Sequence, residues 1–460
     1  MGVRGAEARR EQSEIAVLSG GKMIDLYQRA PSRCIRFKFD RCDGETFMPA
    51  SGVKFDPVEV PRDFRLDLYR GFALWLIFLA HIPGTIFNRI TPWNYGFSDP
   101  AEVFIFVSGY ANAYVYGRVM EQRGFLVGGA QIVRRALEAY VAQIFLFVIL
   151  IGEVFWLSHG SLALEDVANI RVVHERPEES IMALLQLKFM PVNMNVLPLY
   201  VVVLAVSPVI LWLLRKTPAL ALTLATTVYA AANWFALNLP SFPYGYWYFN
   251  PLAWQLLFVL GAWCGLGATD WVWPLVRSRL VLICAAVYAV SVFVLFLPWN
   301  GLNVAALVPE WSLYAFGKTN LGVLRLLHFL ALAIIADWLI PREWPPLTWW
   351  VLRPLIVCGQ HSLEVFCLGV ALAFAGQAAA VDAPGNAIIR FLIALLGITV
   401  MVAVSALLSW YSSTRVSFRI VTDDPEARIG AVNRRAVVLL PQSVGSGPGS
   451  NPVATDLSGP

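Results

Sequence analysis

Two residues in a long apolar segment have types and spacing that suit chemistry inside a membrane. The segment starts at Leu68 and holds Arg70 and His81, eleven residues apart. Eleven helical residues at 100° each return to within about 20° of the starting direction, so both side chains lie on one helix face. The same stripe carries Asp67, Leu74, Phe78 and Thr85. Ionisable groups in a span are costly and usually functional, which favours chemistry or proton movement along this stripe.

The depths of these two groups differ. A rise of 1.5 Å per residue puts Arg70 near the inner membrane surface and His81 about 16 Å further out. Pro83 removes a helical hydrogen bond, which predicts a kink beside His81. The alternatives are a hydrogen-bonded packing histidine at position 81 and a positive-inside anchor at position 70.

A carboxylate is expected near His81. The next apolar segment opens with Asp99, Pro100 and Glu102, an arrangement typical of a helix start with a capping box. Capping alone would explain Glu102. A cap would also place a carboxylate at the outer end of the second helix, within reach of His81. Gly109, on roughly the same face, predicts the close approach of another helix.

Two further pairs of polar residues lie in apolar segments. Arg325 and His328 are three residues apart on one helix face, at about the depth of His81. His361 and Glu364 have the same spacing nearer the middle of the bilayer. Structural pairing is the alternative for each couple. Together these groups predict a polar cavity that crosses the membrane.

The composition identifies the elements that must hold these groups. Hydrophobic residues make up 58% of the 460 residues and charged residues only 14%, against about 25% charged in soluble domains. This excludes soluble, disordered and coiled-coil classes and predicts an all-α polytopic membrane protein. A helix of about 20 apolar residues crosses a bilayer. Ten spans are predicted, at 68–87, 100–117, 137–157, 196–214, 218–238, 251–269, 280–298, 321–340, 354–378 and 388–411.

Charge sets the predicted topology and the domains. The net charge of +4 is spread between apolar runs, so no nucleic-acid partner is expected. With the N-terminus inside, the inner connections hold ten Lys and Arg residues and the outer ones five, which puts both termini in the cytoplasm. We expect a polar cytoplasmic extension at 1–61, a ten-helix domain at 62–411, and a partly disordered cytoplasmic tail at 412–460.

The outer connections are rich in aromatic residues. An aromatic belt at the membrane interface would explain them, and a platform for stacking sugar rings is the alternative. They are Tyr244, Tyr246, Trp247, Tyr248, Trp299, Trp311 and Tyr314. No Walker-type glycine loop, His-Glu-x-x-His or Gly-x-Ser-x-Gly motif is present in the sequence, so no metal and no bound cofactor are expected.

The ordered motifs resemble a known family. Arg70 and His81, followed by Ala101-Glu-Val-Phe-Ile-Phe-Val-Ser-Gly-Tyr110, resemble the first two helices of the membrane acyltransferase-3 superfamily. The finer resemblance is to the OpgC family, whose best-known members succinylate periplasmic glucans, and it covers about 62–411. It rests on Arg62–Gly71, Gly96–Glu102, Asn193–Tyr200, Phe249–Phe258, Arg325–His328 and Gly359–Cys367.

The resemblance implies roles for these residues. An acyl group, succinyl in the best-known members, would pass from cytoplasmic acyl-CoA through the bacterial inner membrane to a periplasmic glucan. Arg70 would meet the donor phosphates or gate the inner mouth, and His81 would deprotonate a sugar hydroxyl or carry the acyl group itself. Glu102 would orient His81 or share its proton. Arg325 and His328 would stabilise the oxyanion or bind a succinyl carboxylate.

The remaining candidates, Asp67, His361 and Glu364, are expected to line the donor path. A proton-coupled transporter or exporter of a small solute or glycan is the competing function, since buried Arg, His and Glu also suit transport. No inverted repeat between the two halves supports it. A sensor or scaffold without catalysis is a third hypothesis, and the intact His81 and Glu102 argue against it.

Overall fold

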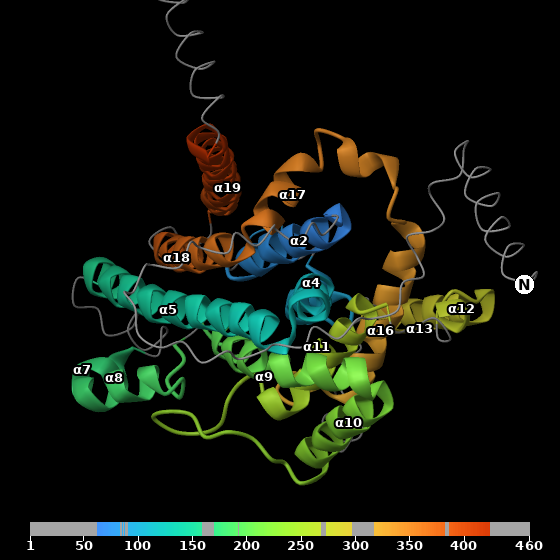
Figure 1. Ribbon diagram of the computed structural model, residues 1–460. Helices are drawn as coiled ribbons and strands as arrows, with labels where there is room; N and C mark the ends of the chain where they lie inside the picture. Colours follow the sequence, from blue (N-terminus) through green and yellow to red (C-terminus); the bar gives the residue numbers. More distant parts are fainter. Residues whose placement is uncertain are drawn as a thin grey trace, which may run out of the picture. The chain divides into compact units, whose positions relative to one another are not determined.

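The described part of the chain is built from helices. The computed structural model describes residues 62–423 except 83–84, 86, 88–90, 159–169, 192, 268–272, 297–316 and 382–385, and within these residues it has no strands. The first half holds α2 (Phe64–Ala80), α4 (Pro100–Arg123), α5 (Phe125–Ser158), α7 (Arg171–Glu175), α8 (Pro177–Leu185), α9 (Val196–Lys216) and α10 (Pro218–Trp234). The second half holds α11 (Pro251–Gly265), α12 (Trp273–Val276), α13 (Arg279–Phe296), α16 (Val323–Leu339), α17 (Arg353–Gln360), α18 (Ser362–Val381) and α19 (Ala387–Asp423). Two short 3₁₀ helices are η1 (Pro92–Asn94) and η3 (Pro345–Thr348). Figure 1 labels the α-helices along the chain.

Each predicted span overlaps a helix, and five helices qualify as membrane spans by length and composition. Among the described residues these candidate spans are Phe125–Trp156, Val196–Lys216, Arg279–Phe296, Ser362–Ala380 and Ala387–Thr414. The other helices that overlap predicted spans are short or polar. α11, for example, has 15 residues, or about 22 Å of helix against a hydrocarbon core of about 30 Å. The all-helical membrane class is therefore supported, and the count of ten stays a prediction.

Three helix boundaries differ from the predicted ones by seven residues or more. α2 ends at Ala80 rather than 87, in keeping with the Pro83-Gly84 sequence that follows, because proline disfavours helix in the residue before it. The kink expected at Pro83 itself lies outside the described residues. α5 begins at Phe125, twelve residues before the predicted 137. α19 continues to Asp423, so the predicted domain boundary at 411 falls inside a helix. Residues 1–61 lie outside the described part.

The predicted ninth span is two helices rather than one. α17 ends at Gln360, and His361 has φ −112° and ψ 45°, outside the helical region. α18 begins at Ser362, where the carbonyl of His361 accepts a hydrogen bond from the amide of Val365 at 2.9 Å. The chain can therefore change direction at His361, and Figure 1 shows α17 and α18 as separate helices.

Two glycine contacts set the distances between the central helices. α4 packs on α11, where a side chain at Gly109 would overlap the carbonyl of Phe258 and one at Gly261 would overlap that of Phe106. This confirms the close approach predicted at Gly109. α2 packs on α17 in the same way, through Gly71 and Gly359. Because α2 also packs on α4, these contacts fix the helix that carries His81 and the helix that carries Glu102.

Candidate active site

The His81 ring is oriented by its own helix. His81 is the C-terminal cap of α2, and its Nδ1 lies 2.6 Å from the carbonyl oxygen of Ile77. A carbonyl oxygen only accepts hydrogen bonds, so Nδ1 must carry the proton in this pair. In the neutral ring Nε2 then has a free lone pair. The geometry therefore prepares Nε2 to take a proton from another molecule.

The surroundings of His81 are apolar and narrow. A cavity of about 10 Å³ lies against the ring and is lined from α2 and from α18, where Val365, Phe366 and Gly369 contribute. This is room for about one water molecule. Gln377, also on α18, donates from its side-chain amide to the carbonyl oxygen of His81 at 2.6 Å. α18 therefore covers the histidine and holds the last turn of α2, a role that the sequence did not reveal for Gln377.

The stripe predicted on α2 faces the protein. Asp67, Leu74 and Phe78 are all buried. The carboxylate of Asp67 pairs with Arg62 at 2.7 Å rather than with Arg70. Arg70 makes no hydrogen bond or ion pair among the described residues, although the charges of Asp67 and Arg135 act on it. Arg70 is therefore a cation that no carboxylate in the described part of the chain neutralises directly.

Glu102 is fully buried and caps α4 as predicted. Its Oε2 accepts the amide hydrogen of Asp99 at 2.9 Å, and Asp99 in turn accepts from the amide of Ala101 at 2.8 Å. Its Oε1 accepts from Nη1 of Arg325 at 2.5 Å. Both oxygens are engaged in this way, and no hydrogen bond joins Glu102 to His81 within the described ranges. A role for Glu102 on His81 is therefore one of positioning.

Four charged groups form a balanced group at the start of α4, which we name the start cluster: Asp99, Glu102, Lys318 and Arg325. Lys318 is ion-paired with Asp99, and Arg325 also lies 3.8 Å from Asp99. Burial disfavours the charged form of Lys318, but the Asp99 carboxylate raises the pKa of this lysine above its ordinary value. Two carboxylates face two cations, so the cluster is neutral as a unit.

Lys318 is a site residue that the sequence did not reveal. It lies in a connection, where it counted only as one positive charge for topology. The structure fixes it through the backbone around it: the indole of Trp254 donates to the carbonyl of Lys318 at 3.1 Å, and the backbone amide of Asn250 donates to the carbonyl of Thr319 at 3.0 Å. The charges of Lys318 and Asp99 are close enough to act on His81. The start cluster and the histidine thus belong to one region.

The other predicted residues divide between two places. His328 is buried beside the start cluster, where its Nδ1 lies 2.8 Å from the hydroxyl of Ser98. Phe97 packs edge-on against the same ring. His361 bonds through Nε2 to Ser409 on α19 at 2.8 Å, and the neighbouring Glu364 is exposed. His361 therefore joins two helices and shares no contact with the start cluster within the described residues.

The proposed sugar platform is only partly exposed. Tyr244, Tyr246 and Tyr248 are exposed, whereas Trp247 is 97% buried and serves the packing of its loop. Trp299, Trp311 and Tyr314 lie outside the described residues. The three tyrosines remain available for stacking, either on sugar rings or at a membrane surface.

Comparison with known proteins identifies a family over most of the chain. The family model described as OpgC protein matches residues 62–413. This range includes α2, α4, the start cluster and His361, and it ends within α19. No curated protein and no solved structure gives a significant match.

Proposed function

The chain belongs to the OpgC protein family, and on this basis we propose that it is a membrane O-acyltransferase that moves a succinyl group from cytoplasmic succinyl-CoA to a hydroxyl of a periplasmic glucan. The family match supports an acyltransferase-type enzyme, and the apolar helices support a membrane location. The succinyl donor, the glucan acceptor, the inner membrane, the cytoplasmic termini and the wider acyltransferase-3 relationship belong to the proposal.

The short contact between Nδ1 of His81 and the carbonyl oxygen of Ile77 is the observation that carries the mechanism. Since Nδ1 donates to Ile77, Nε2 takes the proton of a sugar hydroxyl as that oxygen attacks the thioester carbonyl. The new C–O bond replaces the C–S bond. The coenzyme A thiolate leaves and receives the proton from the imidazolium ring, which restores the starting state. A proton donor and acceptor of this kind contributes about 10²- to 10⁴-fold in rate.

The start cluster supplies the fixed frame for this step. Arg325 is neutralised by Glu102 and Asp99, so it is better placed to hold the helices than to attract a succinyl carboxylate. In the proposal Glu102, Arg325 and His328 fix the wall of the site opposite His81. Arg70, which has no carboxylate partner among the described residues, gates the donor path further along α2.

The test is mass spectrometry of periplasmic glucans. A host strain without this gene is complemented with the wild type, with His81→Ala, or with His174→Ala, which removes an exposed histidine of α7. The succinyl mass increment should return with the wild type and His174→Ala and stay absent with His81→Ala. Full glucan succinylation by a normally inserted His81→Ala protein would exclude the mechanism.

The transporter alternative predicts a different result in the same strains. A transporter moves its solute without consuming acyl-CoA, so purified protein with succinyl-CoA and glucan would form no ester. If glucan masses are identical in every strain and no ester forms in vitro, the acceptor assignment fails. An ester that forms with another acyl donor would keep the enzyme class and change the donor.

A further inference from the structure

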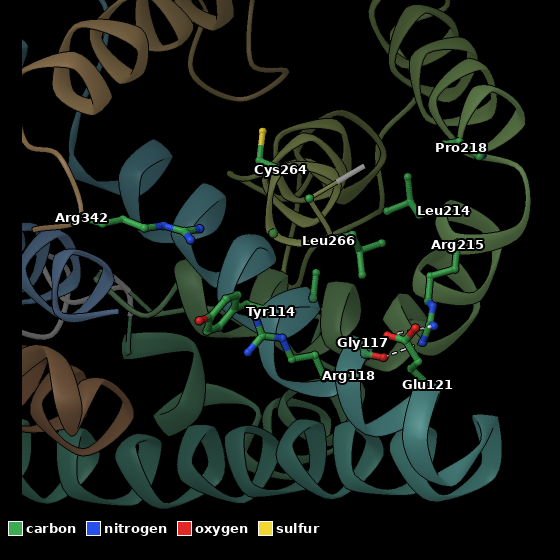
Figure 2. A pocket seen from close by; sticks show the side chains of 13 residues that line it. Tyr114, Gly117, Arg118, Glu121, Leu214, Arg215, Pro218, Cys264, Leu266 and Arg342 are labelled. Atoms are coloured by element: carbon green, nitrogen blue, oxygen red, sulfur yellow. Dashed lines mark hydrogen bonds and ion pairs between the residues drawn. The ribbon is translucent and has the colours of Figure 1, made fainter. Parts of the chain in front are cut away.

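A second, larger cavity lies at the opposite end of α4 from the start cluster. Its volume is about 480 Å³, and it is lined by α4, by the junction of α9 and α10, by the end of α11, and by the segment after α16. Three arginines line it, one from each of three segments: Arg118, Arg215 and Arg342 (Figure 2). We name it the arginine cavity. Glu121 is its one acidic lining residue among those described, so the lining carries two positive charges in excess.

The three arginines are held differently. Arg215 is anchored by the carbonyl of Gly117 at 2.5 Å and by Glu121 at 3.5 Å, as the dashed lines in Figure 2 show. Arg342 donates to the hydroxyl of Tyr110 at 3.1 Å and lies 3.6 Å from Asp63. Arg118 lies over the ring of Tyr114, 4.3 Å from its centre, and makes no ion pair in the described part of the chain. Two guanidinium groups therefore retain free donors toward one space.

This arrangement suits phosphate. A guanidinium group presents paired N–H donors that match two phosphate oxygens, and its charge strengthens each hydrogen bond. Excess positive charge in a recess attracts an anion. We propose that the arginine cavity binds the phosphate groups of the acyl donor, with Arg118 and Arg342 as the principal ligands. This assignment rests on the proposed function, because it takes coenzyme A as the phosphate-bearing part of the donor.

The position of the cavity fits that donor. Arg342 reaches Asp63, the residue that caps the start of α2, whereas His81 caps its end. Along α4, Arg118 lies 16 residues beyond Glu102, or about 24 Å of helix. The Lys and Arg distribution places the cavity end in the cytoplasm. An acyl-coenzyme A carries its phosphates and its thioester at opposite ends of a long pantetheine arm, so the two ends can occupy the two regions.

Anionic phospholipid headgroups carry the same phosphate chemistry and could also reach a cavity near the membrane surface. The experiment must therefore separate two sources. Full-length protein is reconstituted in phosphatidylcholine nanodiscs, and the binding of coenzyme A and of phosphate-free pantetheine is measured. In parallel, native mass spectrometry measures phosphatidylglycerol retained from the membrane. The variants are Arg118→Gln, Arg342→Gln and the double variant, and the matched control is Arg134→Gln, whose side chain is 82% exposed.

We expect each cavity variant to weaken coenzyme A binding roughly tenfold, the effect of one charge-assisted hydrogen bond, and to leave pantetheine binding and the control unchanged. Loss of phosphatidylglycerol with unchanged coenzyme A binding would assign the site to a lipid headgroup. If the double variant binds coenzyme A and retains phosphatidylglycerol as the wild type does, the proposed phosphate site is wrong. If the wild type binds no coenzyme A and acylates no glucan, the proposed function fails instead. The phosphatidylglycerol measurement then shows by itself whether the arginine cavity binds phosphate.

Discussion

The two ends of α4 differ in whether their charged side chains neutralise one another. At its start, two carboxylates and two cations neutralise each other in a buried group, and the fully buried Glu102 uses both oxygens. At its other end, three arginines surround a cavity with one glutamate. A balanced buried group contributes to structure and resists change, whereas an unbalanced open group is suited to a charged ligand. We therefore call the start of α4 its structural end and the end at the arginine cavity its binding end.

The largest effect is expected at the start cluster. Arg325→Met leaves the Glu102 carboxylate buried without its closest cation, and removing one partner of a buried pair typically costs about 3–5 kcal/mol in the free energy of unfolding. Thermal unfolding in detergent should show a large drop in Tm. Adding Glu102→Gln should recover part of the loss, because a neutral glutamine still completes the capping box. An unchanged Tm for Arg325→Met would show that the start cluster is not structural.

The next largest effect is expected where α4 meets α11. Gly109→Ala places a methyl group on the carbonyl of Phe258, and overpacking of this kind costs about 1–3 kcal/mol. Gly152→Ala is the control, since nothing lies within 4 Å of a side chain there. The same Tm measurement should find the control neutral or slightly stabilised, because alanine favours helix. Equal losses in the two variants would contradict the close packing.

A smaller effect on stability is expected at Gln377, with a clear effect on activity. Gln377→Leu removes the hydrogen bond to the carbonyl of His81, worth about 0.5–1.5 kcal/mol. The last turn of α2 should loosen, so kcat for acyl transfer should fall while KM for the donor stays within about twofold. Gln377→Glu, which keeps the length and loses the donor when ionised, tests the direction of the bond. A raised KM with unchanged kcat would place Gln377 on the donor path instead.

The smallest effect on stability is expected at the binding end. Arg118→Gln loses only the contact of the half-buried arginine with the Tyr114 ring, worth about 1 kcal/mol, so its Tm should stay close to that of the wild type. The comparison between the ends would fail if Arg118→Gln and Arg325→Met shifted Tm equally. A loss of coenzyme A affinity in Arg118→Gln without a change in Tm would support the distinction between the two ends.

The sequence predicted the local features and missed the long-range ones. The helix face of Asp67, Leu74 and Phe78 follows from a periodicity of 3.6 residues, and the capping box at Asp99 and Glu102 follows from a four-residue pattern. Pairing between Arg325 and Glu102 spans 223 positions, and no local rule identifies it. The ion pair of Lys318 with Asp99 is equally remote.

The arginine cavity shows the same limit. Arg118, Arg215 and Arg342 each lie near a helix end, so in sequence they indicated only membrane topology. Their convergence depends on how α4, α9 and the segment after α16 pack. The break at His361 also escaped prediction, because neither proline nor glycine occupies that position and apolar residues resume on both sides of the short polar stretch from Gln360 to Ser362.

The hydrogen bond from His81 to Ile77 has a consequence for how this site can vary. In a Ser-His-Asp triad the group that orients the histidine is a side chain, so one substitution can abolish it. Here the orienting acceptor is a main-chain oxygen, which every amino acid at position 77 provides. Relatives could therefore carry another residue at this position and keep the same tautomer. Only a change in the path of the last helical turn would alter the proton position, so a comparison of side chains alone would overlook the residue that orients His81.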